Sequence, residues 1–298
     1  MKPPERETTV LPFLALLLSA TVWGVMWYPL RLFEARGLDG LWITFIFFAG
    51  ATVAGMVLMA GRLRRLGGQP WVVLGIALAS GWCNTTFNLA MLEGNVMRAL
   101  LLFYLSPLWA TLIGWGFLGE RLTPLSLLLL GISILGAVIM LWQPGAMVPW
   151  PTGRADWLAI GSGLAFAILN ALIRHGTRVP LPIKMMASWV GVLLVAGVWL
   201  VVIGIPAPAT GAGTISAAAL FGAVVIVIAT LSVQYGVTHM PVHRSAIILL
   251  FELVAGAVSA GLLTNEVVSL REWLGGGLIV VAAMISARMT LRPGPTAG

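Results

Sequence analysis

The chain has 298 residues, of which 59% are hydrophobic and 9% are charged, whereas soluble globular proteins average about 45–50% apolar and about 25% charged residues. So few charges cannot cover the surface of a soluble fold, and we expect a polytopic membrane protein. The net charge of +7 does not indicate nucleic acid as a partner, because membrane proteins collect Lys and Arg in cytoplasmic loops. One cysteine and three histidines cannot build a disulfide framework or a zinc site, so we expect no metal and no cofactor.

Apolar runs follow one another along the whole chain, and a spanning helix needs about 20 mainly apolar residues. Ten such runs cover residues 10–30, 41–60, 71–90, 99–118, 124–142, 157–173, 185–205, 216–237, 245–264 and 273–289. The longest linker, residues 143–156, is short and rich in Pro and Gly, so no soluble domain fits between them. The sequence therefore predicts an all-α integral membrane protein with ten transmembrane helices.

The basic residues predict the orientation. Twelve of the 17 Lys and Arg residues fall on the side of the membrane that holds the N-terminus, and five fall on the other side. Since cytoplasmic loops carry the excess of positive charge, we expect both termini in the cytoplasm. We expect the protein to lie in the inner membrane of the cell. We expect it to act as a monomer in the lipid bilayer.

The two halves of the chain share landmarks at an offset of 146 residues. Arg98 aligns with Arg244 and Glu120 aligns with Glu266, so each half has an Arg, twenty-one intervening residues and a Glu around one apolar run. Any apolar chain aligns weakly with itself, but a charged pair at equal spacing favours a true duplication.

This duplication predicts two repeats of five helices, one in residues 1–145 and one in residues 146–298. An odd number of helices forces the second copy to enter the membrane upside down relative to the first. Inverted repeats are typical of transporters, in which two similar halves exchange conformations and open a shared site to either side.

The motifs at the end of the fourth run resemble a known family. Ser106-Pro107 lies within this run, and the sequence Leu-Gly-Glu-Arg-Leu ends it at residues 118–122, with Glu266 in the equivalent place. This pattern resembles the ten-helix EamA branch of the drug/metabolite transporter superfamily, and within it the YddG-type exporters of aromatic and other amino acids. The resemblance implies a basket-like bundle with a central cavity. The second half has Glu252-Leu253 in place of Ser106-Pro107, which departs from the pattern.

Polar side chains recur every four residues on two of the predicted helices. Ser80, Asn84 and Asn88 form one stripe on the third helix, and Thr230, Gln234 and Thr238 form another on the eighth. A spacing of four places each set on one helix face. These helices are equivalent in the two repeats, so the stripes can face each other across a cavity. The alternative is that the amides hydrogen-bond to neighbouring helices as structural contacts.

Aromatic residues and two further polar groups complete the expected cavity. Trp23 and Trp27 share one face of the first helix, although a Trp pair at this spacing also suits packing. We expect the cavity near the midplane to be lined by Trp23, Trp27, Asn84, Asn88, Tyr104, Asn170, Gln234, Tyr235 and Glu252. Rings with a few amides suit an amphipathic organic solute, because aromatic faces cover apolar groups and attract an ammonium group.

Glu252 is the one carboxylate well inside a predicted span, some eight residues beyond Arg244 and so about 12 Å along the helix. Acids inside a membrane usually have a function. It can accept a coupling proton, bind the ammonium group of a substrate, or be satisfied by a neighbouring hydroxyl. Pro107 frees the carbonyl of Phe103 and is expected to bend the fourth helix as a hinge.

Charged residues at segment ends have a structural interpretation. Arg98, Arg244, Glu120 and Glu266 are expected to act as anchors or as ion pairs between the repeats, with gating as the alternative. The histidines at positions 175, 239 and 243 are expected to be ordinary interface residues.

The function that fits these features is export of small organic metabolites, with aromatic or other apolar amino acids as substrates, by alternating access. No nucleotide-binding motif is visible, so gradients would supply the energy. A transporter of nucleotide sugars or drugs is an alternative, which would call for extra basic residues in the cavity, whereas the Arg and Lys residues here lie near segment ends. A membrane-embedded lipid-modifying enzyme fits less well, because no nucleophile, base or metal ligand set converges, and we expect no enzymatic activity.

Overall fold

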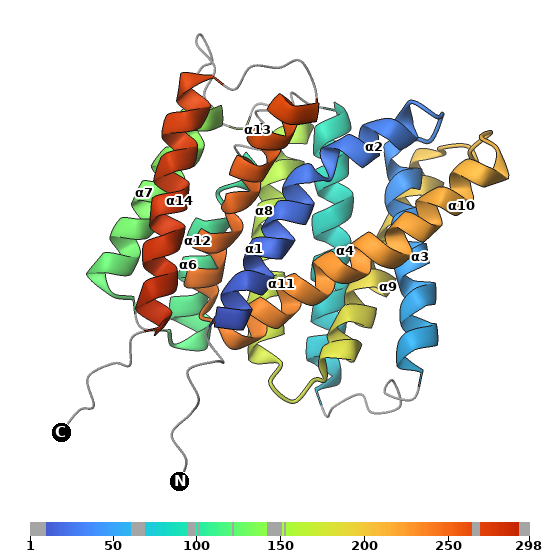
Figure 1. Cartoon of the computed structure of the whole chain (residues 1–298). Coiled ribbons are helices and arrows are strands. Elements are labelled where there is room, and N and C mark those ends of the chain that lie inside the picture. Colours follow the sequence, from blue (N-terminus) through green and yellow to red (C-terminus); the bar gives the residue numbers. More distant parts are fainter. Residues whose placement is uncertain are drawn as a thin grey trace.

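The protein folds into a bundle of helices (Figure 1). This computed structural model describes residues 10–60, 69–93, 99, 102–120, 122–141, 151, 153–263 and 269–291, and no strand occurs among them. The helices are α1 (Val10–Val25), α2 (Trp27–Glu34), α3 (Gly40–Met59), α4 (Pro70–Glu93), α6 (Ser106–Leu118), α7 (Pro124–Leu141), α8 (Arg154–His175), α9 (Leu181–Ile203), α10 (Ala212–Phe221), the π-helical turn η2 (Gly222–Ile226), α11 (Val227–His239), α12 (Val242–Leu249), α13 (Phe251–Leu263) and α14 (Leu270–Leu291).

Seven of these stretches are long and apolar enough to cross a membrane. They are Val10–Glu34, Gly40–Leu58, Pro70–Ala90, Arg154–His175, Leu181–Ile203, Ala212–His239 and Val242–Leu263, and two shorter apolar helices cover Pro124–Ile139 and Trp273–Ala282. The expected fourth span is described only in part, at residue 99 and from residue 102 onward. The prediction of a multi-span helical membrane protein is confirmed, whereas the count of ten spans stays a prediction.

Capping residues fix several helix ends. The side chain of Asp39 accepts a hydrogen bond of 2.8 Å from the backbone N–H of Leu41 and so starts α3. At the end of α6, Gly119 has a φ of 64°, a left-handed conformation that glycine adopts without strain. This turn sends the chain back toward Gly114, whose carbonyl accepts a hydrogen bond from the N–H of Glu120.

The helix contacts in the two halves correspond to each other. Helix α4 packs against α8 and α9, and in the same way the segment from α10 to α11 packs against α1 and α3. Helix α6 contacts α8, as α13 contacts α1. The pairs α3 with α9 and α7 with α14 join equivalent helices. These contacts of the described helices therefore correspond pairwise between the two halves.

Helix directions follow from the contacts at one end of the bundle. In Figure 1, α1 begins and α14 ends at the same end, which we call the terminal side. The end of α11 lies there too, because Gly236 packs against Pro12 at the start of α1. Arg174, at the end of α8, donates a 2.5 Å hydrogen bond to the carbonyl of Thr238. Thus α8 ends on the side where α1 begins, and α1 and α8 run in opposite senses.

Large apolar side chains cover the outer faces of the bundle. Val201 on α9 is 81% exposed and Leu262 on α13 is 79% exposed. Such exposure would be costly in water but matches contact with lipid.

Glycines bring two pairs of helices into backbone contact. On α9, Gly191 lies against the Ala77 backbone of α4, and Gly81 of α4 lies against the Gly191 carbonyl. On the equivalent pair, Gly222 meets the Phe47 backbone and Gly50 meets the Ala219 backbone. Small residues allow this close approach, which van der Waals packing then stabilises in a membrane.

Candidate functional site

Two interrupted helices meet in the interior. The fourth span turns at Tyr104 and Leu105 before α6 begins at Ser106, and Leu250 separates α12 from α13. Leu250 aligns with Tyr104 at the offset of 146 residues. Pro107 occupies the first turn of α6, where its missing N–H does not interrupt a helical hydrogen bond. The break in the first half therefore has a local cause, whereas the equivalent break at Leu250 has no proline.

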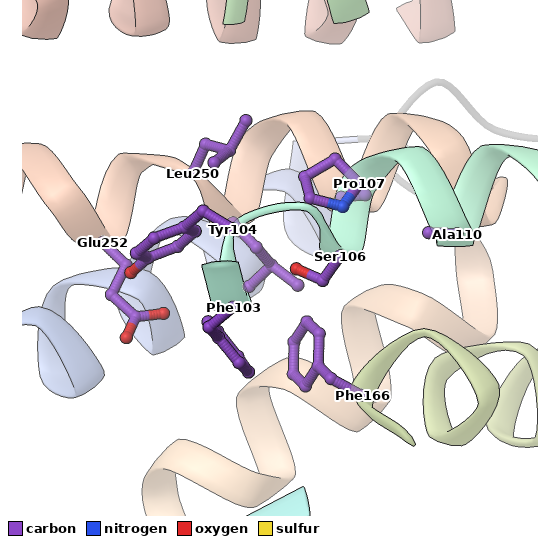
Figure 2. A pocket seen from close by; sticks show the side chains of 10 residues that line it. Phe103, Tyr104, Ser106, Pro107, Ala110, Phe166, Leu250 and Glu252 are labelled. Carbon is purple, nitrogen blue, oxygen red and sulfur yellow. The ribbon is translucent and has the colours of Figure 1, made fainter. Parts of the chain in front are cut away.

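A small pocket lies between these breaks (Figure 2). Its walls come from α6, α8, α12 and α13 and from the residues at the two breaks, and they consist of Phe103, Tyr104, Ser106, Pro107, Ala110, Phe166, Ala246, Leu249, Leu250 and Glu252. The free space is about 10 Å³, close to the smallest volume that holds one water molecule. The pocket is therefore nearly closed in this conformation.

The chemistry of the pocket combines one carboxylate with aromatic rings. Figure 2 shows Tyr104 pointing toward Glu252, with Phe103 and Phe166 below them in the view. The Phe103 ring lies 5.3 Å from the Tyr104 ring and 5.6 Å from the Phe166 ring. Such a wall can cover an apolar group and attract a cation, while the carboxylate can pair with a positive charge or take up a proton.

Glu252 lies in the first turn of α13. The backbone of the same residue touches α1, since its carbonyl oxygen lies against Gly24. Glu252 is thus fixed where α1, α12 and α13 meet.

Of the nine residues expected to line one cavity, the structure brings Tyr104 and Glu252 together in this pocket, and Pro107 joins them. Two of the expected amides lie in separate helix contacts. The Asn88 amide donates to Thr44 Oγ1 on α3, and Gln234 donates to Ser188 Oγ on α9 over 2.8 Å. These are the helix-to-helix contacts that the alternative interpretation of the stripes foresees.

The remaining expected residues also lie outside the pocket lining. Asn84 donates to its own helix at the Ser80 carbonyl, and Asn170 is buried on α8. Trp23 packs against a buried cluster that contains Trp189, and the indole of Trp27 donates a 2.9 Å hydrogen bond to Ser259 Oγ. The Tyr235 ring lies 4.3 Å from the ring of His239. Their part in a wider cavity stays a prediction.

Phe166 is a pocket residue that the sequence analysis did not select. It lies four residues before Asn170 on α8 and so shares a helix face with it. Selecting the aromatic residues that share a helix face with each interior amide side chain would have identified it. No polar or aromatic pattern indicated Ala246, Leu249 and Leu250, because apolar residues occur on every face of these helices.

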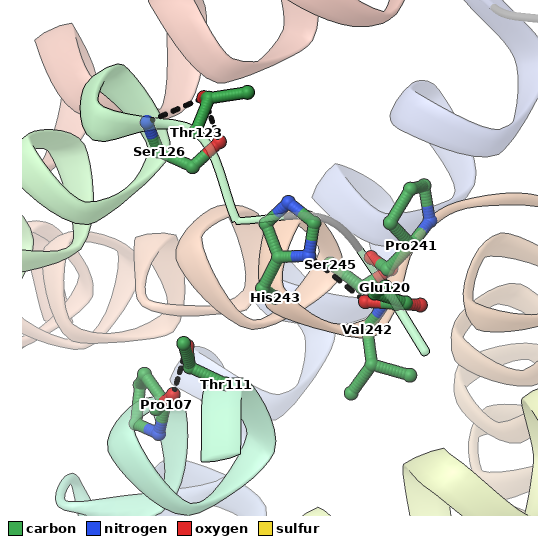
Figure 3. A network of polar contacts seen from close by, with 9 residues as sticks. All are labelled: Pro107, Thr111, Glu120, Thr123, Ser126, Pro241, Val242, His243 and Ser245. Atoms are coloured by element: carbon green, nitrogen blue, oxygen red, sulfur yellow. Dashed lines mark hydrogen bonds and ion pairs between the residues drawn. The ribbon is translucent and has the colours of Figure 1, made fainter. Parts of the chain in front are cut away.

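A second polar site joins the halves on the terminal side (Figure 3). Glu120 Oε1 accepts a hydrogen bond of 2.9 Å from the backbone N–H of Val242, the first residue of α12, and Oε2 lies 2.8 Å from Nδ1 of His243. Burial by itself would raise the pKa of Glu120, but the hydrogen bonds from His243 and Val242 and the charge of His243 outweigh it, so this pKa is lowered.

This arrangement shows how Glu120 connects the two halves, whereas its repeat partner Glu266 and also Arg98 lie outside the described residues. His243 is not the ordinary interface residue that the sequence analysis expected, because it is 5% exposed and bonded to Glu120. Its partner is 123 positions away along the chain, so no local pattern indicates this contact.

The buried Lys184 is used by the fold rather than by the pocket. Its Nζ donates to the carbonyl of Ile173 over 2.6 Å and to Thr238 Oγ1 over 3.4 Å, and so caps the end of α8. Among the residues that the structure describes, no group of three or more His, Cys, Asp or Glu side chains could hold a metal ion.

Comparisons with known proteins agree with this architecture. An uncharacterized transporter of Pseudomonas aeruginosa is 30% identical over 135 residues, which cover 44% of this chain and 42% of that protein. An uncharacterized transporter of Archaeoglobus fulgidus is 24% identical over 92% of this chain and 95% of its own length. A crystal structure that is 18% identical superposes with a TM-score of 0.75 over 96% of this chain and 99% of the other, which shows a common fold.

The family assignment comes from matches in both halves. The sequence model of the EamA-like transporter family matches residues 11–142 and, a second time, residues 153–288. These two stretches cover most of the chain and contain every residue of the pocket. The protein therefore belongs to the EamA-like transporter family.

Proposed function

We propose that this transporter exports small organic metabolites, namely amino acids with aromatic or other apolar side chains. The observation that carries the proposal is the position of Glu252 in a mainly apolar, ring-lined pocket where two interrupted helices meet. A carboxylate in such surroundings favours a partner with a positive charge, and the ammonium group of an amino acid supplies one. Phe103, Tyr104 and Phe166 would cover the apolar side chain.

The start of α6 suits the other charged group of an amino acid. Ser106 and Pro107, which line the pocket, form the first turn of α6. The positive end of this helix dipole favours an anion, and half-helices aimed at a substrate carboxylate are common in transporters. One pocket would thus contain an acid for the ammonium group, a helix start for the carboxylate and rings for the side chain.

Transport by alternating access is part of the proposal. We infer ten transmembrane helices in two inverted repeats, residues 1–145 and 146–298, around a central cavity. The corresponding helix contacts of the two halves and the opposite senses of α1 and α8 support this inference. The narrow pocket supports it as well, because an amino acid enters about 10 Å³ of free space only if helices move apart.

The substrate proposal is tested by counterflow in proteoliposomes preloaded with a candidate amino acid. We expect labelled tryptophan or phenylalanine to exchange at least about 10-fold faster than aspartate, because an additional unpaired charge is costly to bury. N-acetylphenylalanine keeps the ring and the carboxylate but lacks the ammonium charge, and it should not exchange. Equal exchange of the acetylated compound, or exchange of nucleotide sugars or drugs in place of amino acids, would contradict the proposal.

We also propose that the protein lies in the inner membrane of the cell with both ends of the chain in the cytoplasm. The excess of Lys and Arg on the terminal side supports this orientation. A green fluorescent protein fused after Gly298 should fluoresce, and alkaline phosphatase fused there should be inactive. Active phosphatase at this position would reverse the orientation.

A further inference from the structure

The terminal side of the Glu252 pocket is closed by two short helices. Helices α6 and α12 pack against each other and extend from the pocket toward the terminal side. At this end of the pocket, Ala110, Val242 and Ala246 cluster with Ala167 of α8, and larger side chains of α6 pack against this cluster, namely Trp109, Ile113 and Leu118. The contact between the two helices is therefore apolar along this stretch.

The Glu120 carboxylate crosses this contact at its outer end. It follows α6 in the chain and binds two groups at the start of α12, the N–H of Val242 and the ring of His243 (Figure 3). The side chains of His243 and Glu120 are only 6% and 12% exposed. Arg244 adds a positive charge close enough to interact with Glu120. Hydrogen bonds to a charged group, shielded from water and at the positive end of a helix, are among the stronger polar contacts in proteins.

Gly114 provides the space for this carboxylate. A methyl group built on Gly114 would lie 2.8 Å from Glu120 Oε2, too close for a nonbonded contact, and 3.9 Å from the Val242 side chain. Two residues further along α6, a methyl group on Gly116 would meet no atom within 4 Å. Substitution by alanine therefore creates a clash with Glu120 at Gly114 and none at Gly116.

We propose that Glu120 is a latch that holds the terminal side of the pocket shut by tying the end of α6 to the start of α12. Release of the carboxylate leaves only apolar packing between these parts of the two helices, and their separation exposes Ser106 to the terminal side. The latch lies outside the pocket and touches none of its polar groups, so it controls access rather than substrate binding. The inference depends on the transporter assignment but not on which substrate is carried.

The test measures access to the pocket with a single cysteine. Ser106 lines the pocket and is 4% exposed, and Ser106→Cys is nearly isosteric. All variants carry Cys83→Ser, which removes the only native cysteine of the chain. A membrane-impermeant maleimide is then applied to membrane vesicles of each orientation. No substrate is needed, so a failure of the amino acid proposal would leave this result unaffected.

We expect Gly114→Ala and Glu120→Ala each to raise the labelling rate of Ser106→Cys from the terminal side about 10-fold or more. Glu120→Ala removes the charge-assisted hydrogen bonds of the closed state, and the methyl of Gly114→Ala displaces the carboxylate from them. Gly116→Ala should label at the rate of the parent. Labelling from the opposite side should not rise.

Two results would overturn the latch. In one, Gly114→Ala and Glu120→Ala both label at the rate of Gly116→Ala, which would make Glu120 a helix cap without control over access. In the other, labelling rises equally from both sides, which would indicate general loosening of the bundle. If Glu120→Ala does not fold, Gly114→Ala alone decides between these outcomes, since it keeps every polar group of the latch and adds one methyl.

Discussion

Replacing Glu252 by glutamine is expected to lower the rate of gradient-driven transport about 100-fold, because removing one partner from a buried charge pair costs several kcal/mol. Glutamine keeps the size of the side chain and most of its hydrogen bonds, so the helices around the pocket should still pack. Glu252 lies beside Tyr104 at the junction of α12 and α13, where a substrate or a proton would be bound. Uptake into proteoliposomes measures the effect.

The same variant separates two functions of this carboxylate. If Glu252 carries a coupling proton, Glu252→Gln should lose gradient-driven uptake but keep counterflow exchange, because exchange needs no net proton movement. If Glu252 binds the ammonium group of the substrate, both activities should fall together. Glu34→Gln is the matched control, since Glu34 is exposed at the end of α2 and should tolerate the change. Normal activity of Glu252→Gln in both assays would leave a structural role only.

The sequence predicted the helical membrane fold because long apolar runs have one common solution in a bilayer. Helix interruptions were harder to predict. Pro107 indicates a break near α6, but Leu250 separates α12 from α13 without any proline or glycine. That break lies opposite the interrupted fourth span, so its cause is tertiary packing that a single segment does not reveal.

The polar stripes show a different limit of sequence reasoning. A period of four places Asn84 and Asn88 on one helix face, but it does not tell which neighbour that face meets. In the structure, the Asn88 amide binds Thr44 on α3 and Gln234 binds Ser188 on α9. For Glu120, the equal Arg-to-Glu spacing in both halves identified the residue from the sequence. Its contacts with Val242 and His243 are visible only in the structure.

Gly191→Ala is expected to destabilise the protein by about 3 kcal/mol, because an added methyl would overlap the Ala77 backbone and push α9 away from α4. Backbone atoms cannot move aside as a flexible side chain can, so the strain spreads along this helix pair.

The matched control is Gly131→Ala on the exposed face of α7, where a methyl meets no atom within 4 Å. There the gain in helix propensity should stabilise the protein by up to about 1 kcal/mol. The measurement is thermal unfolding in detergent. Gly191→Ala should have a lower melting temperature than the parent, and Gly131→Ala should have an equal or higher one. A melting temperature of Gly191→Ala that matches or exceeds the parent would mean that the crossing of α4 and α9 does not depend on backbone contact.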